Sequence, residues 1–122
     1  MIHGYILTFF LLSGIFAMTH YVAVQASLYW YFWWFDSVMH FWGGCLIGLG
    51  IHALATFADF HIKPSYKFIL TILLVVTVSW EIFEWYYGIA GTRNYAFDTT
   101  KDIFLGFSGG LLAHTILRRR IQ

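Results

Sequence analysis

The sequence predicts an all-α integral membrane protein, with four transmembrane helices and an aromatic interfacial segment between the first two. Of its 122 residues, 60% are apolar and 22% are aromatic. Only 11% are charged, against about 25% in an average soluble domain. A chain of this length forms a single domain, residues 1–122, and leaves about 40% of its chain surface in contact with solvent. That solvent must be lipid, which excludes secreted enzymes, nucleic-acid binders and disulfide scaffolds.

Four stretches have about the 20 mostly apolar residues that a membrane helix needs: 5–24, 36–57, 67–88 and 98–117. The first lacks a basic segment and a clear small-x-small cleavage site, so we expect a span rather than a signal peptide. Residues 25–35 (QASLYWYFWWF) are too aromatic for a loop in water and too short to cross. They predict a segment at the depth of the lipid headgroups. Pro64 falls in a connection, and no internal repeat is evident.

Basic residues predict the orientation. Five of them lie on one side of the predicted bundle: Lys63, Lys67, Arg118, Arg119 and Arg120. The positive-inside rule makes that side cytoplasmic, which predicts a bacterial inner-membrane protein with both termini in the cytoplasm. Arg93 and Lys101 lie on the opposite side and are outnumbered.

The acidic residues gather at the other, extracytoplasmic side. Five of the six lie at the outer ends of the predicted spans: Asp36, Glu81, Glu84, Asp98 and Asp102. With Arg93 and Lys101 subtracted, a formal deficit of three charges remains there. An unpaired carboxylate within a span is costly, so such residues usually face a bundle interior or a water-filled cavity.

Helical spacing places these groups on shared faces. Asp36 and His40 are four residues apart, as are Asp98 and Asp102, while Glu81 and Glu84 are three apart. Glycines at four-residue spacing, typical of close helix packing in lipid, continue two of these faces: Gly44, Gly48, Gly106 and Gly110. We therefore expect the last three spans to converge on one outward-opening cup of carboxylates and imidazole. Five tryptophans are expected to form its rim: Trp30, Trp33, Trp34, Trp42 and Trp85.

Three outcomes can offset the negative charge of this cup. Some acids can be protonated, Arg93 and Lys101 can pair with them, or a divalent cation can bind. Carboxylates with one imidazole suit Zn²⁺, Mg²⁺, Mn²⁺ or Ca²⁺. The ligands would be Asp36, His40, Asp98 and Asp102.

Such a metal would activate water for attack on a phosphoester. Glu81 or Glu84 would then act as general base and Arg93 as phosphate clamp. This predicts a metal-dependent hydrolase or transferase acting on a lipid or lipid-linked substrate. Whether the protein is an enzyme stays open.

Structural roles compete with these assignments. Asp36 and Asp98 are candidate helix N-caps, whereas Glu81, Glu84, His40 and Asp102 lie too far inside their spans to cap them. Among the remaining residues, His52 and His114 are expected at the inner interface, His20 in a structural contact, and Cys45 in the core.

Three motifs in order, FDSVMHFWGG, WEIFEW and DTTKDIFLGFSGG, resemble the YjdF-like inner-membrane proteins and the broader VanZ-like group linked to teicoplanin resistance. The VanZ-like proteins more often carry Glu-x-x-Gln where this chain has Glu81 and Glu84. The resemblance implies a polytopic protein of the cell envelope without an established reaction. The motif residues that match are Asp36, His40, Glu81, Glu84, Asp98 and Asp102, with Arg93 as a looser match.

Two further functions stay open at this point. The chain can be a non-catalytic envelope-binding protein of the antibiotic-resistance type. It can also be a small accessory subunit of a larger membrane complex, or a homo-oligomer.

Overall fold

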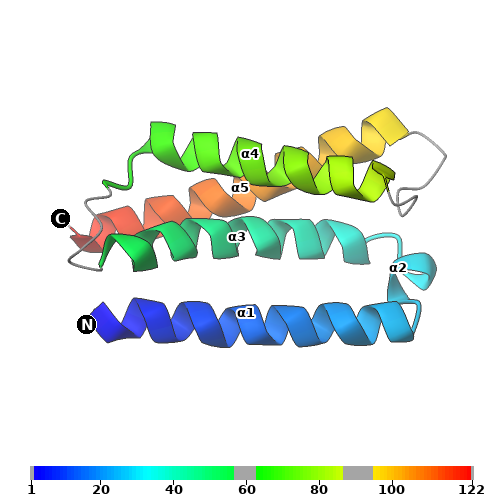
Figure 1. The fold of residues 1–122 in the computed structure, drawn as a ribbon, viewed down its shortest axis with the longest axis horizontal. Helices are drawn as coiled ribbons and strands as arrows, with labels where there is room; N and C mark the ends of the chain where they lie inside the picture. Colours follow the sequence, from blue (N-terminus) through cyan, green and yellow to red (C-terminus); the bar gives the residue numbers. More distant parts are fainter. Residues whose placement is uncertain (1, 57–62, 87–94, 122) are drawn as a thin grey trace.

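The structure, a computed structural model, describes residues 2–56, 63–86 and 95–121, without the side chains of residues 2–3, 95–96, 98 and 119–121. Across these residues it is all-helical, which confirms the predicted class. The helices are α1 (Ile2–Gln25), α2 (Leu28–Tyr31), α3 (Phe35–Ala55), α4 (Tyr66–Tyr86) and α5 (Tyr95–Ile121). Figure 1 shows the start of α1 and the end of α5 at the same end of the molecule.

Within the part of the chain that the structure describes, three helices have the length and apolar composition to cross a membrane, in place of the predicted four. They are α1 from Gly4, α3 and α4. The fourth predicted span, 98–117, lies inside α5 but does not qualify. Lys101, Asp102 and its several glycines lower the hydropathy of this helix. α5 instead packs against α3 as its main partner.

Local signals set the ends of these helices. Ser65 precedes α4, and its hydroxyl accepts a hydrogen bond from the Phe68 N–H, as an N-cap does. The preceding Pro64 lies outside the helix, as its missing N–H requires. α3 begins at Phe35 with no side-chain cap, so the N-cap role expected for Asp36 is wrong. Asp98 lies inside the first turn of α5, which also excludes it as the N-cap.

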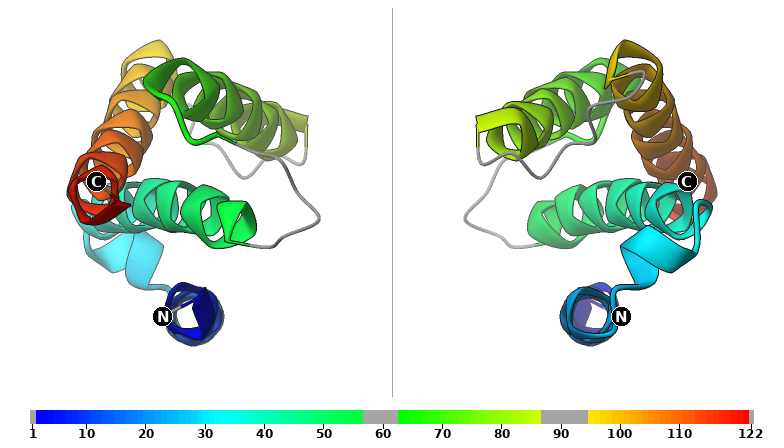
Figure 2. Two further views of the ribbon diagram at one scale, coloured as in Figure 1. Left: turned by 90° about the vertical axis from the view of Figure 1, so that its left-hand side faces the viewer. Right: turned by 90° about the vertical axis from the view of Figure 1, so that its right-hand side faces the viewer.

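The helices pack in the order α1, α3, α5, α4, with a smaller direct contact between α3 and α4. Figure 2 shows this arrangement end-on, with α1 on the far side of α3 from α4. The buried core lies where α3, α4 and α5 meet, and contains Ile51, Ile69 and Leu73. Among the described residues of α1, only Ala23 is buried. Much of the apolar surface of α1 is therefore left for lipid or another protein.

α3 and α5 run parallel in a constant register. Four residue pairs separated by 62 positions face one another: His40 and Asp102, Gly44 and Gly106, Gly48 and Gly110, and His52 and His114. We call this line of pairs the α3–α5 seam. A Cβ atom added at Gly44 would lie inside van der Waals contact of the Gly106 carbonyl oxygen. The glycines therefore allow the two backbones to touch, as expected from their spacing.

The register also aligns a short pattern that the two helices share. Both carry Asp-x7-Gly-x3-Gly-x3-His, beginning at Asp36 in α3 and at Asp98 in α5. Four shared positions do not make an internal repeat, so that expectation is unchanged. The residues shared by the two helices are few. They lie at positions that face the α3–α5 seam or lie one turn before its first pair.

Candidate functional site

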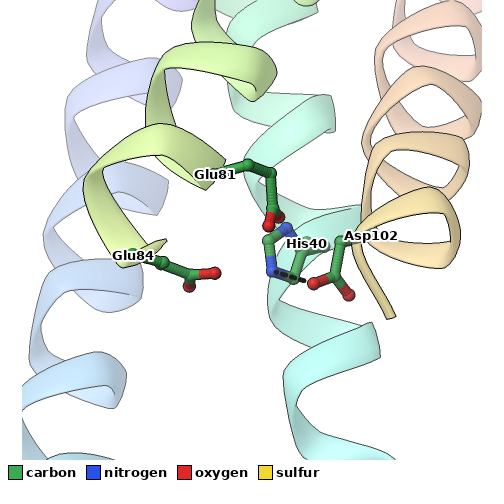
Figure 3. Close-up of side chains that lie close together, drawn as sticks. All are labelled: His40, Glu81, Glu84 and Asp102. Atoms are coloured by element: carbon green, nitrogen blue, oxygen red, sulfur yellow. Dashed lines mark ion pairs between the residues drawn. The ribbon is translucent and has the colours of Figure 1, made fainter. Parts of the chain in front are cut away.

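Four side chains from three helices meet at the end of the bundle where α3 begins. His40 comes from α3, Glu81 and Glu84 from α4, and Asp102 from α5. One nitrogen or oxygen atom of each lies within 4.8 Å of the corresponding atoms of all the others. Figure 3 shows both glutamates of α4 pointing toward His40 and Asp102. We call these four residues the carboxylate–histidine cluster.

His40 is the centre of this cluster. Its Nε2 atom lies 3.3 Å from Oδ1 of Asp36, one turn earlier on α3, and 3.3 Å from Oδ2 of Asp102 across the seam. Both distances exceed the roughly 2.7–2.9 Å of a charge-assisted hydrogen bond. An N–H at this position can share its proton between the two carboxylates in a three-centre hydrogen bond. The arrangement gathers negative charge around the His40 imidazole.

Two of the carboxylates are held by donors of their own. The Thr99 hydroxyl donates to Oε2 of Glu81 at 3.2 Å, and the Trp80 indole donates to Oε1 of Glu84 at 2.8 Å. Asp36, from outside the cluster, is instead an acceptor, and its Oδ1 faces Nε2 of His40 at 3.3 Å. Partners of this kind fix the orientation of metal-binding side chains in known metal sites.

Burial makes the charge of the cluster expensive. Asp102 is 2% exposed and Glu81 is 6% exposed. A buried carboxylate costs several kcal/mol unless its charge is offset. With Asp36 included, four carboxylates surround one imidazole, and Lys101 is the neighbouring described cation. The described cations do not match four ionised acids.

Tyr29 of α2 completes the surroundings at this end. Its hydroxyl lies 2.8 Å from Nδ1 of His20, and its ring packs against Phe35. Burial, reinforced by the Asp36 and Glu84 carboxylates, raises the pKa of the Tyr29 phenol to about 12. Tyr29 therefore stays neutral at physiological pH and ties the interfacial turn to α1. His20 has the structural role expected for it.

The structure brings together most, but not all, of the predicted site residues. Asp36, His40, Glu81, Glu84 and Asp102 share one location, as predicted. Asp98 lies one turn before Asp102 on α5, but its side chain is not described. Arg93, the predicted phosphate clamp, lies outside the described residues.

The predicted aromatic rim is only partly correct. Trp30 and Trp33, on and next to α2, are 85% and 81% exposed, as an interfacial segment requires. Trp42 instead packs edge-on against Phe16 of α1. The orienting role of Trp80 and the position of Tyr29 were not predicted. The only sequence signal for Trp80 is its place four residues before Glu84.

The four donors are of the kinds that can hold a divalent cation. Three carboxylate oxygens and one imidazole nitrogen match the ligands of Zn²⁺ and Mn²⁺. Donors bound at about 2.0–2.2 Å in a tetrahedral site lie about 3.3–3.6 Å apart. The four atoms lie within 4.8 Å of one another, so these side chains would have to move closer together to bind one ion.

The chain was compared with known families, curated proteins and solved structures. A protein family described as "Predicted membrane protein (DUF2238)" matches residues 2–122, nearly the whole chain. No curated protein and no solved structure matches the chain. The family match is consistent with the YjdF-like resemblance and gives no support to the VanZ-like one.

Proposed function

Because the chain belongs to the DUF2238 family of predicted membrane proteins, we propose that it holds one divalent cation in the carboxylate–histidine cluster and acts on a lipid or lipid-linked phosphoester. The observation that supports this proposal is the convergence of four ligand atoms from three helices within 4.8 Å. Burying several carboxylates against one another is unfavourable, because their negative charges repel and are removed from water. A bound cation would offset this electrostatic cost.

The geometry favours a different division of roles from the one expected from sequence. His40, Glu81, Glu84 and Asp102 are the proposed ligands, and Asp36 orients the imidazole. A bound cation would supply Lewis acidity for phosphoester chemistry and lower the pKa of a bound water. Two metal ions are not favoured, because the described donors form a single group.

The proposed location is the bacterial inner membrane, with the cluster near the extracytoplasmic face and both termini in the cytoplasm. The described basic side chains at the end opposite the cluster, Lys63, Lys67 and Arg118, are exposed, which supports this orientation. An apolar hollow of about 310 Å³ between α1, α3 and α5 supports contact with a lipid chain. Leu12, Cys45 and Leu112 are among its lining residues.

Metal binding is tested on the purified full chain by elemental analysis and by titration with Zn²⁺, Mn²⁺, Mg²⁺ and Ca²⁺. We expect one equivalent of metal and a higher melting temperature with metal than with chelator. His40→Gln and Asp102→Asn should abolish binding, while Asp36→Asn should weaken it by about 10–100-fold. His20→Gln is the matched control, because this histidine lies at the same end but outside the cluster.

Catalysis needs a separate assay. Phosphate release from phosphatidic acid or an isoprenyl diphosphate should depend on the bound metal and disappear in Glu81→Gln. Metal binding without turnover would remove the enzymatic part of the proposal. A protein without stoichiometric metal, and with the same melting temperature after chelation, would remove the metal itself.

The exposed surface supports a second candidate, a small accessory subunit of a larger membrane complex. α1 buries only Ala23 among its described residues, and α2 presents Trp30 and Trp33 outward. A stoichiometric partner retained through purification in mild detergent would favour this role. The non-catalytic, envelope-binding alternative predicts instead that changes at Trp30 and Trp33, and not at His40, abolish the cellular phenotype.

A further inference from the structure

A second polar contact closes the α3–α5 seam at the end opposite the carboxylate–histidine cluster. Nε2 of His52 lies 2.8 Å from Nδ1 of His114, and the two residues are 1% and 0% exposed. The sequence had suggested interfacial side chains that reach for water. The structure buries both, so the prediction is wrong for this pair. The helical register explains the error, because it turns both imidazoles toward the seam.

This contact depends on protonation. A neutral imidazole has one donor nitrogen and one acceptor nitrogen, whereas a protonated one has two donors. The His52–His114 hydrogen bond therefore needs at least one neutral ring. If both rings are protonated, two N–H groups and two positive charges face each other across 2.8 Å.

Among the described residues, no carboxylate near the pair would stabilise a second charge. The remaining ring nitrogens, Nδ1 of His52 and Nε2 of His114, have no hydrogen-bond partner among the described residues. From α4, the Tyr66 ring packs edge-on against His114 at 4.4 Å between centroids. From α5, the Arg118 guanidinium lies 5.2 Å above the Tyr66 ring and adds positive charge. The described carboxylates lie at the other end of the seam.

We infer that His52 and His114 form a pH-sensitive latch, closed when at least one ring is neutral and opened when both are protonated. The latch holds the ends of α3 and α5 together beyond the last glycine pair of the seam. It acts independently of the proposed metal site. Twelve residues, about 18 Å of helix, separate His52 from His40.

Linkage gives the size of the effect. Separated imidazoles each take up a proton near pH 6.5. The open state then holds two protons where the closed pair holds at most one. Well below this pH the ratio of open to closed molecules should rise, for each unit of acidification, by about tenfold if the closed pair holds one proton and by about a hundredfold if it holds none.

Spin labels measure this opening directly. Leu54 and Ile116 are exposed neighbours of the pair on α3 and α5, at the same separation of 62 positions along the chain. Both are replaced by cysteine in a Cys45→Ala background, and the distance between the labels is recorded at pH 8 and pH 5. We expect one distance at pH 8 and a second, longer one at pH 5. The double variant H52Q/H114N retains an amide hydrogen bond at the same atoms but cannot be protonated, so its distance should not change.

His40→Gln is the control for the other end of the seam, and it should leave the acid-induced change intact. If the distance between the labels is the same at pH 8 and pH 5 in the protein that retains His52 and His114, the latch is overturned. A change that persists in H52Q/H114N would also overturn it, because the protons would then bind elsewhere.

Discussion

Alanine substitution at two adjacent glycines tests the α3–α5 seam most directly. Gly43 and Gly44 are neighbours on α3, but they face different surroundings. A Cβ atom at Gly43 would lie 3.8 Å from the Phe16 ring, an ordinary contact. At Gly44 it would overlap the carbonyl group of Gly106, which is backbone and cannot rotate away. Gly43→Ala should be tolerated, and Gly44→Ala should force the helices apart.

The expected difference in the free energy of unfolding between the two variants comes from the clash that only Gly44→Ala introduces. Both gain the same intrinsic helix propensity, about 1 kcal/mol, so this contribution cancels. Overpacking against a fixed neighbour costs about 1–3 kcal/mol. Gly44→Ala should therefore be less stable than Gly43→Ala by about 1–3 kcal/mol. The separation of the helices should also loosen the His40–Asp102 contact, one turn away on each helix.

The assay is equilibrium unfolding of detergent-solubilised protein by added SDS, followed by circular dichroism. Gly14→Ala on α1 is a second control, because nothing lies within 4 Å of the position that its Cβ would take. It should be at least as stable as the unmodified chain. Equal stability of Gly43→Ala and Gly44→Ala would refute the seam, because it would mean that the α3 and α5 backbones do not touch there.

Three further predictions concern the cluster and its surroundings. The exchange H40D/D102H retains an imidazole–carboxylate contact across the seam, so isothermal titration should show about tenfold tighter metal binding than for either single change. Trp80→Phe removes the donor to Glu84 and should weaken metal binding by about 10–100-fold in the same assay, while equal affinity would exclude an orienting role. The Tyr29 phenol should ionise near pH 12 in an ultraviolet titration, against an ordinary value of 10.0, and Tyr29→Phe should remove that step. Since the folded value is the higher one, this group's contribution to stability should be lost as the pH rises from about 10 to about 12.

The sequence was sufficient to predict the helices and the content of the cluster. Apolar length alone locates α1, α3 and α4 within two or three residues at each described end. Helical spacing and the cost of carboxylates in lipid were enough to group Asp36, His40 and Asp102. The helix positions and this grouping follow from the spacing of residues along each helix and from the lipid surroundings. Neither requires knowledge of how one helix is aligned with another.

The register is what the sequence did not provide. His52 and His114 look like isolated polar residues near helix ends until α3 and α5 are aligned 62 positions apart. Their shared pattern with Gly48 and Gly110 was the available signal, but it consists of too few matches to stand out. The apolar character of α5 was also overestimated. Its apolar residues suffice to pack against α3, whereas its charged residues make it a poor span by itself.

The separation of 62 residues between partners also has a consequence during synthesis. A ribosome adding about 5–20 residues per second needs about 3–12 seconds to proceed from one imidazole to the other. Throughout that interval His52 lacks the imidazole, and His40 the Asp102 carboxylate, that each contacts across the seam in the folded chain. α5, which is made after α3, therefore completes the packing of the α3 seam face.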